Sequence, residues 1–367
     1  MSTSELKQLP LAAIHEAAGA RFGPFAGWSM PLTYPPGVLK EHMHTREHAG
    51  LFDISHMQLV RIEGKDAATL LERVCPLEAD EIAIGQSKYT FLLNGSAGII
   101  DDLIVTRLAE SRFMVVANAG NATRDLEHIG SAAADRDCAV TPLDRVLLAL
   151  QGPEAATVLK KSGIFEPDQL VFMTGAEPRE DWFVSRSGYT GEDGFEMAMP
   201  VEEAARAAET LLADGRCQWI GLAARDSLRL EAGLCLHGQD IDESTTPVEA
   251  GLLWAIPKSL RENGNFIGAG ALRKAIETGP VRRRVGIAPV GRQPVRAGVK
   301  LFDADDNPAG DITSGGYGPS AGRPVAMGYV ESKYAQPETE LFAEVRGNRL
   351  PVLVHKLPFV SHRYLRG

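Results

Sequence analysis

The chain changes character after Gly279-Pro280, and this change limits the folds that it can adopt. Before that point, amphipathic segments of helical length alternate with short apolar runs typical of strands. After it, short strand-like runs separated by turn residues follow one another, for example at Arg284–Pro289 and Val325–Val330. We therefore predict an α+β core in residues 1–275 and an all-β domain in residues 276–367.

Residues 57–134 show the order strand, helix, three strands, helix, which indicates an α+β unit. The elements expected there are the strands Met57–Ile62, Tyr89–Leu93, Ile99–Leu108 and Phe113–Ala117 and the helices Ala67–Val74 and Asn121–Ala134. A similar succession follows, with strands near Val146–Leu150 and Trp182–Arg186 and helices near Glu154–Lys161, near Val201–Leu212 and from Leu222.

The segment Phe22–Gly37 contains closely spaced glycines and prolines, which argue against a regular helix or strand. Its aromatic side chains, Phe25 and Trp28 among them, indicate an ordered loop that packs on the body of the protein. Loops of this kind often wall a pocket.

The overall composition excludes several classes of protein. Apolar residues make up 44% of the 367 residues and charged residues 23%, which is ordinary globular usage and argues against disorder. The net charge of −10, with no basic tail, disfavours binding to nucleic acid or to an anionic membrane. No run of about 18 apolar residues occurs, and residues 1–9 lack the apolar segment of a signal peptide. We expect a cytoplasmic protein whose partners are a small molecule or another protein.

Neither the cysteines nor the histidines have the spacing of a metal site. The four cysteines lie far apart without a C-x-x-C pair, which favours reduced thiols in the core. His44 and His48 lie one helical turn apart, but no H-E-x-x-H motif or cluster of carboxylates accompanies them. We expect a partly exposed helix there and no bound metal.

Two adjacent acids, Asp101 and Asp102, stand within an apolar, strand-like segment, Gly98–Val105. Successive residues of a strand point to opposite faces, so these carboxylates cannot work as a paired acid and base. Burying an ionised carboxylate without partners costs roughly several kcal/mol, so each acid needs donors, a cation or a ligand. The structural alternative is that the acids accept hydrogen bonds from backbone amides of a hairpin at residues 94–98.

A third acid, Glu196, follows a loop that has glycine at positions 188, 191 and 194. The alternation of Phe195, Glu196 and Met197 places the carboxylate on one face at the start of a strand. There it can accept two parallel hydrogen bonds, from an arginine or from an amino-pyrimidine edge such as that of a pterin. Taken alone, the motif favours a structural turn, and the absence of G-K-[ST] excludes a P-loop.

Arg225 and Arg229 share one face of an expected helix, because they are four residues apart. Two cations on one stripe repel each other and need anions. Asp226 and Glu231 could supply them within the chain, and the carboxylates of a ligand are the other source. Taken alone, the pattern favours the internal ion pairs.

In combination and in order, these segments resemble the aminomethyltransferase, or T-protein, family of the glycine cleavage system. The resemblance runs almost from end to end and excludes a chance match. Four departures from the family pattern are minor: Ala97, Ala223, His237 and Gln239 stand where Gly, Gly, Tyr and Asn are frequent. The blocks that carry the resemblance are Phe25–Pro31, Ala49–Met57, Gly98–Val105, Arg186–Glu196, Ala224–Leu236 and Thr246–Leu252.

The resemblance implies a three-domain, cloverleaf-like α+β fold with a C-terminal β-barrel or jelly-roll-like domain. Two interleaved subdomains, the second covering approximately residues 54–139, would surround a tetrahydrofolate cavity. The implied reaction moves a one-carbon unit from the aminomethyl-lipoyl group of the H protein to tetrahydrofolate. It yields ammonia, 5,10-methylenetetrahydrofolate and dihydrolipoyl H protein. The H protein is thus the implied partner, and the isolated chain is expected to be a monomer.

The resemblance also implies roles for particular residues. Asp102 matches the catalytic aspartate of the family, whose charge would stabilise a developing positive charge and relieve a folate nitrogen of its proton. Glu196 would hold the pterin edge. The other implied folate contacts are Met57, Tyr89, Asn118, Tyr189, Arg225 and Arg363.

Two other functions are alternatives on this fold. A folate-dependent demethylase is disfavoured, because Tyr189–Gly194 and Asp101-Asp102 match the aminomethyltransferase pattern. A folate-binding assembly factor without enzymatic activity would lack the catalytic carboxylate. It would also usually carry a distinct cysteine motif, in which Cys235 does not stand.

Overall fold

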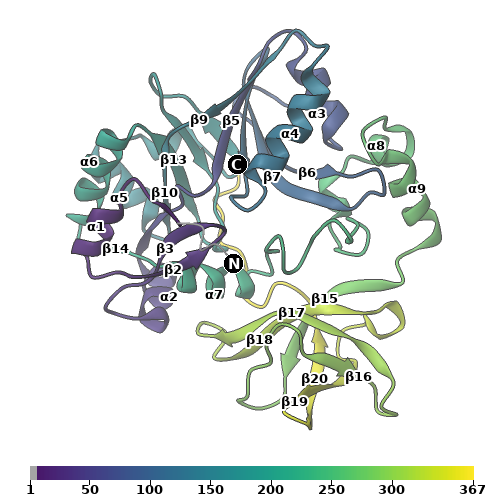
Figure 1. Ribbon diagram of the computed structural model, residues 1–367. Coiled ribbons are helices and arrows are strands. Elements are labelled where there is room, and N and C mark those ends of the chain that lie inside the picture. The colour runs from purple at the N-terminus through teal and green to yellow at the C-terminus, as the bar shows by residue number, and fades with distance from the viewer. Residues whose placement is uncertain (1–5) are drawn as a thin grey trace.

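The computed structural model describes residues 6–367, which form a mixed helix-and-sheet core and a closed barrel beside it (Figure 1). The predicted α+β class with an all-β C-terminal region is confirmed. The expectation that residues 1–9 contain no signal peptide falls partly outside the described residues. Within residues 6–367, no helix has both the length and the apolar character needed to cross a membrane.

A six-stranded sheet forms the centre of one half of the core. Its middle strands are buried along their whole length, because helices pack on one face and the second core sheet on the other. In β10, Val146, Leu148 and Leu150 face the helices, whereas Leu147 and Ala149 face the opposite side. The strand order is β11-β12-β13-β10-β4-β14. The strands are β4 (Ala49–Asp53), β10 (Val146–Gln151), β11 (Thr174–Ala176), β12 (Phe183–Arg186), β13 (Gly194–Met199) and β14 (Cys217–Trp219).

A five-stranded sheet, in the order β6-β7-β8-β5-β9, forms the other half. Leu103 and Val105 on β7 pack into the apolar cluster under the helices α3 and α4, while Asp102 and Ile104 point to the opposite face. The alternation in this strand therefore sends one side of the sheet to the helices and the other to a cavity. The strands are β5 (Gln58–Glu63), β6 (Ser87–Leu93), β7 (Ile99–Ala109), β8 (Arg112–Ala117) and β9 (Ala139–Leu143).

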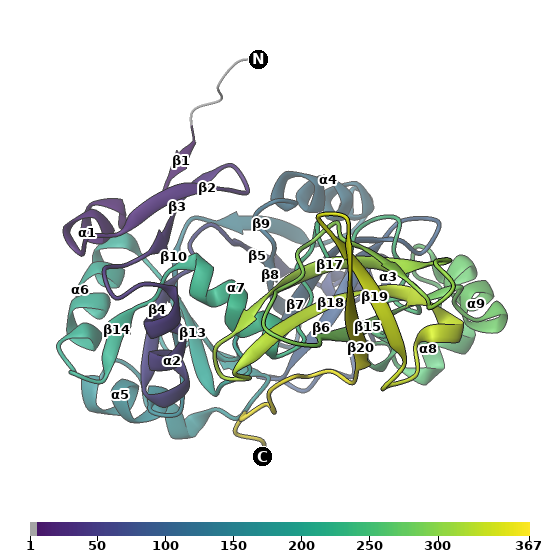
Figure 2. The same ribbon diagram turned by 90° about the horizontal axis from the view of Figure 1, so that it is seen from below.

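Helices cover the outer faces of both sheets (Figures 1 and 2). They carry apolar residues on one side, as in α6, where Ala204, Ala208 and Leu211 are buried. The α-helices are α1 (Ala12–Ala17), α2 (Val38–Glu47), α3 (Ala67–Val74), α4 (Ala122–Ala133), α5 (Ala155–Ser162), α6 (Val201–Leu212), α7 (Leu222–Glu231), α8 (Lys258–Asn263) and α9 (Ala269–Thr278). Short 3₁₀ turns occur at η1 (Pro167–Gln169), η2 (Leu253–Ala255) and η3 (Ser332–Tyr334).

The prediction of an irregular loop at Phe22–Gly37 is wrong. A small sheet with the order β1-β3-β2 forms there from β1 (Lys7–Gln8), β2 (Arg21–Phe25) and β3 (Trp28–Thr33). Ala26 and Gly27 both have positive φ, the geometry of a tight two-residue hairpin turn. The sequence Ala-Gly does not predict such a turn. The expected pocket wall is confirmed, because Phe25, Ala26 and Leu32 line the main cavity.

The barrel closes in the order β15-β18-β17-β16-β19-β20, and its interior is filled with aliphatic side chains. The expected boundary between residues 275 and 276 falls inside α9 and stays a prediction. After the barrel, the tail returns along the core (Figures 1 and 2), where the Phe172 amide donates to the Leu365 carbonyl at 2.8 Å. The barrel strands are β15 (Arg282–Pro289), β16 (Lys300–Phe302), β17 (Pro308–Gly318), β18 (Arg323–Glu331), β19 (Glu340–Val345) and β20 (Asn348–His355).

The turn between β6 and β7 fixes the strand that carries the two acids. Asn94 Oδ1 accepts hydrogen bonds from the amides of Ser96 and Gly98, both at 2.9 Å. The alternative in which Asp101 and Asp102 accept those amides is therefore wrong. Gly98 lies against the backbone of Glu243, so closely that a Cβ atom would come within 1.8 Å of the Glu243 carbonyl oxygen.

Gly98→Ala should lower the free energy of unfolding by about 2 kcal/mol or more, the effect of an overpacked site whose neighbour is backbone. Gly95→Ala in the same turn is the matched control, because, its two chain neighbours apart, no described residue has a heavy atom within 4 Å of the added Cβ. Thermal unfolding measures both variants. Equal stabilities would contradict the close approach of the two segments.

Candidate active site

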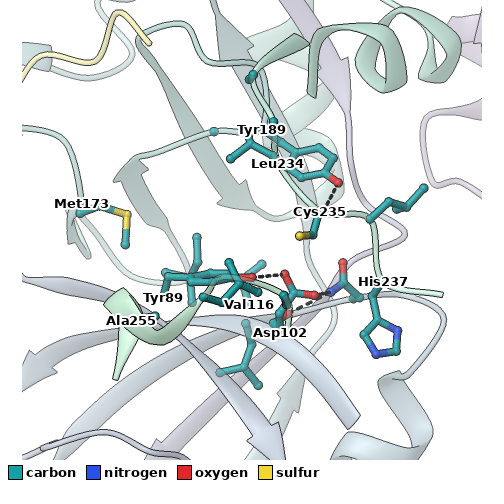
Figure 3. A pocket seen from close by; sticks show the side chains of 18 of the residues that line it. Tyr89, Asp102, Val116, Met173, Tyr189, Leu234, Cys235, His237 and Ala255 are labelled. Atoms are coloured by element: carbon teal, nitrogen blue, oxygen red, sulfur yellow. Dashed lines mark hydrogen bonds between the residues drawn. The ribbon is translucent and has the colours of Figure 1, made fainter. Parts of the chain in front are cut away.

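A cavity of about 1700 Å³ lies between the two core sheets, the barrel and the C-terminal tail. Its walls come from segments far apart in the sequence, including β6, β7, β8, α7, the connection after α7 and the start of the tail. Figure 3 shows the side chains around Asp102, with Tyr189, Leu234 and Cys235 on the facing wall. Apolar surface predominates in the lining, so the polar groups of the cavity stand beside mainly apolar walls.

Asp102 presents its carboxylate to this cavity from the middle of β7. Its Oδ2 accepts a hydrogen bond from the Tyr89 hydroxyl at 2.8 Å, and its Oδ1 accepts one from Asn118 Nδ2 at 3.0 Å (Figure 3). Burial, together with the negative charge of Asp101, raises the pKa of Asp102 to about 6, although the Tyr89 bond opposes this rise. Asp102 is therefore mainly ionised at neutral pH but easily protonated below it.

Asp101 points to the helix side of the sheet and does not line the cavity, as the alternation predicted. Its carboxylate accepts hydrogen bonds from the backbone amide of Asn118 at 2.9 Å and from Asn121 Nδ2 at 2.6 Å. The Asn118 side chain donates to Asp101 as well as Asp102, so one amide links two carboxylates that face opposite ways. His237 supports Asn121, because its Nδ1 accepts from Asn121 Nδ2 at 2.9 Å.

Glu196 and Arg225 are two further charged groups of the cavity lining, and both are buried. Ser187 Oγ donates to Glu196 Oε2 at 3.0 Å. Among the described residues, this is the only hydrogen bond to the Glu196 carboxylate. Burial raises the pKa of Glu196, while the Arg225 charge opposes this. The Arg225 guanidinium lies 4.8 Å from the Tyr189 ring centroid, and its Nη1 has no hydrogen-bond partner among the described residues.

The two arginines on α7 have different surroundings, although they are one turn apart. Arg229 donates to Asp226 at 2.8 Å, so the expected pairing with Asp226 is confirmed. The expectation for Glu231 is wrong, because Glu231 binds Arg46 at 3.0 Å and Arg229 takes the buried Asp240, at 2.5 Å, as its second anion. Arg225 has no such pair with a carboxylate among residues 6–367. A buried cation without full pairing is costly, which is typical of a side chain reserved for a ligand.

The other predicted contacts separate into two groups. Met57, Tyr89, Asn118 and Tyr189 all line the cavity, as do Glu196 and Arg225. Arg363 does not: its guanidinium donates to Glu192 at 2.6 Å and to the Arg46 carbonyl at 2.7 Å. In this position it anchors the tail to the core.

Three further residues line the cavity that were not predicted from the sequence as ligand contacts. Trp254 is 68% exposed at the rim and stacks on Tyr89, with ring centroids 5.6 Å apart. His56 is buried, and desolvation with the nearby Arg225 charge lowers its pKa to about 3, so its ring is neutral. His237 was noted only as a departure from the family pattern. A lone histidine or tryptophan in the sequence gives no signal by itself, although His56 stands within the block Ala49–Met57.

That the protein binds no metal remains a prediction. No group of three or more His, Cys, Asp or Glu residues among those described could hold a metal ion. His48 instead pairs with Glu154 at 2.8 Å, and His44 bonds the Arg216 carbonyl at 3.0 Å. All four cysteines are free, as predicted, and three of them are buried in the core, whereas Cys138 is only partly buried.

The fold and the cavity together define a class of protein in which an α+β core and a barrel surround a mainly apolar cavity. Two family models match the chain: the GCVT N-terminal domain over residues 11–259 and the glycine cleavage T-protein C-terminal barrel domain over residues 282–361. The chain belongs to the glycine cleavage T-protein family, as the sequence analysis expected.

Relatives cover nearly the whole chain. The mitochondrial aminomethyltransferase of Gallus gallus is 44% identical over 98% of this chain and 94% of its own length. The mitochondrial aminomethyltransferase of Homo sapiens is 41% identical over 98% of this chain and 91% of its own length. The crystal structure of the glycine cleavage system aminomethyltransferase T from Bartonella henselae has 57% identity and a TM-score of 0.97, covering 99% of this chain and 100% of that one.

The cavity residues suit a reduced folate. A pterin edge would offer adjacent N–H donors to Glu196, which receives one hydrogen bond from the described residues, and an oxygen to Arg225 Nη1, which has no partner among residues 6–367. Tyr89 and Tyr189 provide flat surfaces for aromatic rings.

Arg225→Met should leave the stability of the ligand-free protein unchanged or raise it, because a buried and incompletely paired cation is replaced by an apolar side chain. Arg229→Met, one turn further on, should lower the free energy of unfolding by about 3 kcal/mol or more, because it leaves Asp240 buried without its cation. Urea unfolding of both variants tests this contrast. A larger loss for the Arg225 variant would show that Arg225 is structural.

Proposed function

We propose that this chain is the aminomethyltransferase of the glycine cleavage system. It would move the one-carbon unit of aminomethyl-lipoyl H protein to tetrahydrofolate, with release of ammonia and formation of 5,10-methylenetetrahydrofolate and dihydrolipoyl H protein. The near full-length match to proteins named aminomethyltransferase supports the reaction. The single observation that carries the proposal is the ionisable Asp102 carboxylate in a mainly apolar cavity of folate size.

Asp102 would act as the catalytic carboxylate. Tetrahydrofolate, when bound, supplies the two nitrogens that take up the one-carbon unit. The ionised Asp102 side chain would accept a proton from the nearer nitrogen and stabilise positive charge on the carbon that is transferred. At ~4 Å and an effective dielectric constant of ~20, one such charge pair is worth roughly 4 kcal/mol, or about three decades of rate.

Tyr89 and Asn118 would keep the carboxylate in place. Each occupies one oxygen of Asp102, so the side chain has a fixed orientation before a ligand binds. The Tyr89 hydroxyl also favours the ionised form, which is the form that the reaction needs. Glu196 and Arg225 would bind the pterin edge, with Met57 and Tyr189 along the ring. We assign Arg363 to tail anchoring, on the contacts described above.

The partners and setting follow from the same family. Tetrahydrofolate would be the cosubstrate and lipoyl H protein the donor. We also propose a core domain of residues 1–275 and a barrel domain of residues 276–367. The isolated chain would be a monomer. We propose the cytoplasm as the compartment, although the named eukaryotic relatives are mitochondrial. The four free cysteines suit either of these reducing compartments.

The demethylase and the assembly factor make different predictions in one assay. Purified protein is mixed with tetrahydrofolate and aminomethyl-loaded H protein, and ammonia and methylenetetrahydrofolate are measured together. The aminomethyltransferase forms the two products in equal amounts. Neither alternative releases ammonia from this donor, so its absence with active H protein would contradict the proposed function.

Asp102→Asn should reduce turnover in this assay by about 100-fold or more, because the amide carries no charge. In the wild type, kcat should fall as the pH drops through about 6, since Asp102 becomes protonated there. Circular dichroism checks that the variant is folded. Near-wild-type activity of the folded variant would contradict the catalytic assignment.

Tyr89→Phe should move this acid limb upward by roughly one pH unit, because it removes a hydrogen bond that lowers the pKa of Asp102. The pH dependence of kcat is the measurement. Tyr317→Phe is the control, since Tyr317 is half-exposed on the barrel. A downward shift for Tyr89→Phe would be inconsistent with the proposed hydrogen bond.

A further inference from the structure

Asp125 is a buried acid that the proposed mechanism does not use. It lies in the first turn of α4 and is 1% exposed. Neither of its carboxyl oxygens meets an N–H or O–H donor among residues 6–367. An ionised carboxylate in such surroundings would have lost its hydration without any replacement.

The charged groups around Asp125 give it little compensation, because the opposing Arg124 charge is outweighed. On β7, the negative charges of Asp101 and Asp102 both disfavour an ionised Asp125, although Asp102 points to the other face of the sheet, and Cys75, just after α3, is a further acidic group near it. The neighbouring cation on its own helix, Arg124, is bound to Glu243 instead. Burial and the Asp101 charge raise the pKa of Asp125 far above its usual range.

Asp125 lies one helical turn after Asn121: its backbone amide donates to the Asn121 carbonyl at 2.9 Å, and the Asn121 side chain donates to Asp101 at 2.6 Å. Two neighbouring carboxyl groups can share a hydrogen bond only if one of them carries a proton. Asp101 accepts from the Asn118 amide and from the Asn121 side chain, contacts that favour its ionised form. The proton therefore belongs on Asp125, which has no donors of its own.

We propose that Asp125 is a positioning residue that stays protonated and donates a hydrogen bond to Asp101 from the helix side of the sheet. Asp101 in turn holds Asn118, whose side chain donates to the cavity-facing Asp102. A neutral Asp125 limits the negative charge behind Asp102 to that of Asp101. Asp102 can then ionise near neutral pH, as the proposed function requires. The positioning role of Asp125 in catalysis therefore rests on the proposed function.

The first test compares Asp125→Asn with Asp125→Ala. The asparagine amide imitates the protonated acid, because it can donate to Asp101 and carries no charge. Its kcat should stay within about twofold of wild type, and the acid limb of its pH profile should not move. The alanine variant should lose about tenfold in kcat, the effect of one lost hydrogen bond to a charged group. An acid limb that falls by about one unit or more in Asp125→Asn would show that the native residue is charged and would overturn the proposal.

The second test needs no activity. The protonated acid binds a proton in the folded state that the unfolded chain releases above pH ~4, so it destabilises the wild type progressively as pH rises. Relative to wild type, Asp125→Asn should therefore gain stability from pH 5 to pH 8, by about tenfold in the unfolding constant per pH unit. Asp135→Asn, an exposed acid just after α4, is the control and should show no such trend.

A stability difference between Asp125→Asn and wild type that is independent of pH would overturn the proposal. Infrared difference spectra at pH 8 provide a direct check, because wild type should show the carbonyl band of an un-ionised carboxylic acid that Asp125→Asn lacks. Absence of that band also contradicts the proposal. If the wild type proved inactive with H protein and folate, the proposed function would fail, but these two readouts would still decide the state of Asp125.

Discussion

The interior of the core depends on how one strand carries two adjacent carboxylates. The alternation of β7 sends Asp101 toward the helices and Asp102 toward the cavity, so the two charges need separate sets of donors. The Asn118 side chain serves both, and the Asn94–Gly98 turn fixes the strand from which both project. The Asp102 carboxylate is thus held by residues behind it, while its free side faces the mainly apolar cavity.

Much of this arrangement could be predicted from the sequence. Helices such as Ala67–Val74 and Val201–Leu212 have the predicted bounds, because their apolar periodicity matches the face that they bury. The alternation rule separated Asp101 from Asp102. The hairpin at Phe22–Gly37 was missed, since its turn relies on backbone conformations that an Ala-Gly pair does not reveal.

The partners of the charged residues could not be predicted, because they come from distant parts of the chain. Arg229 pairs with Asp240 and bonds Ser314 of the barrel, whereas Arg225, one turn away, faces the cavity. Periodicity placed them on one face but could not assign their anions. Arg363 matched a family position in sequence, yet the fold of the tail brings it to Glu192. These long-range contacts also join the barrel to the core and so complete the cavity wall.

A crystal structure of the complex with tetrahydrofolate tests the central claim most directly. The account predicts the pteridine ring inside the cavity, with its reacting nitrogens beside the Asp102 carboxylate and its amino-pyrimidine edge on Glu196. Arg225 should gain a hydrogen-bond partner from the ligand. A folate bound elsewhere, or one whose reacting nitrogens lie out of reach of Asp102, would contradict the account.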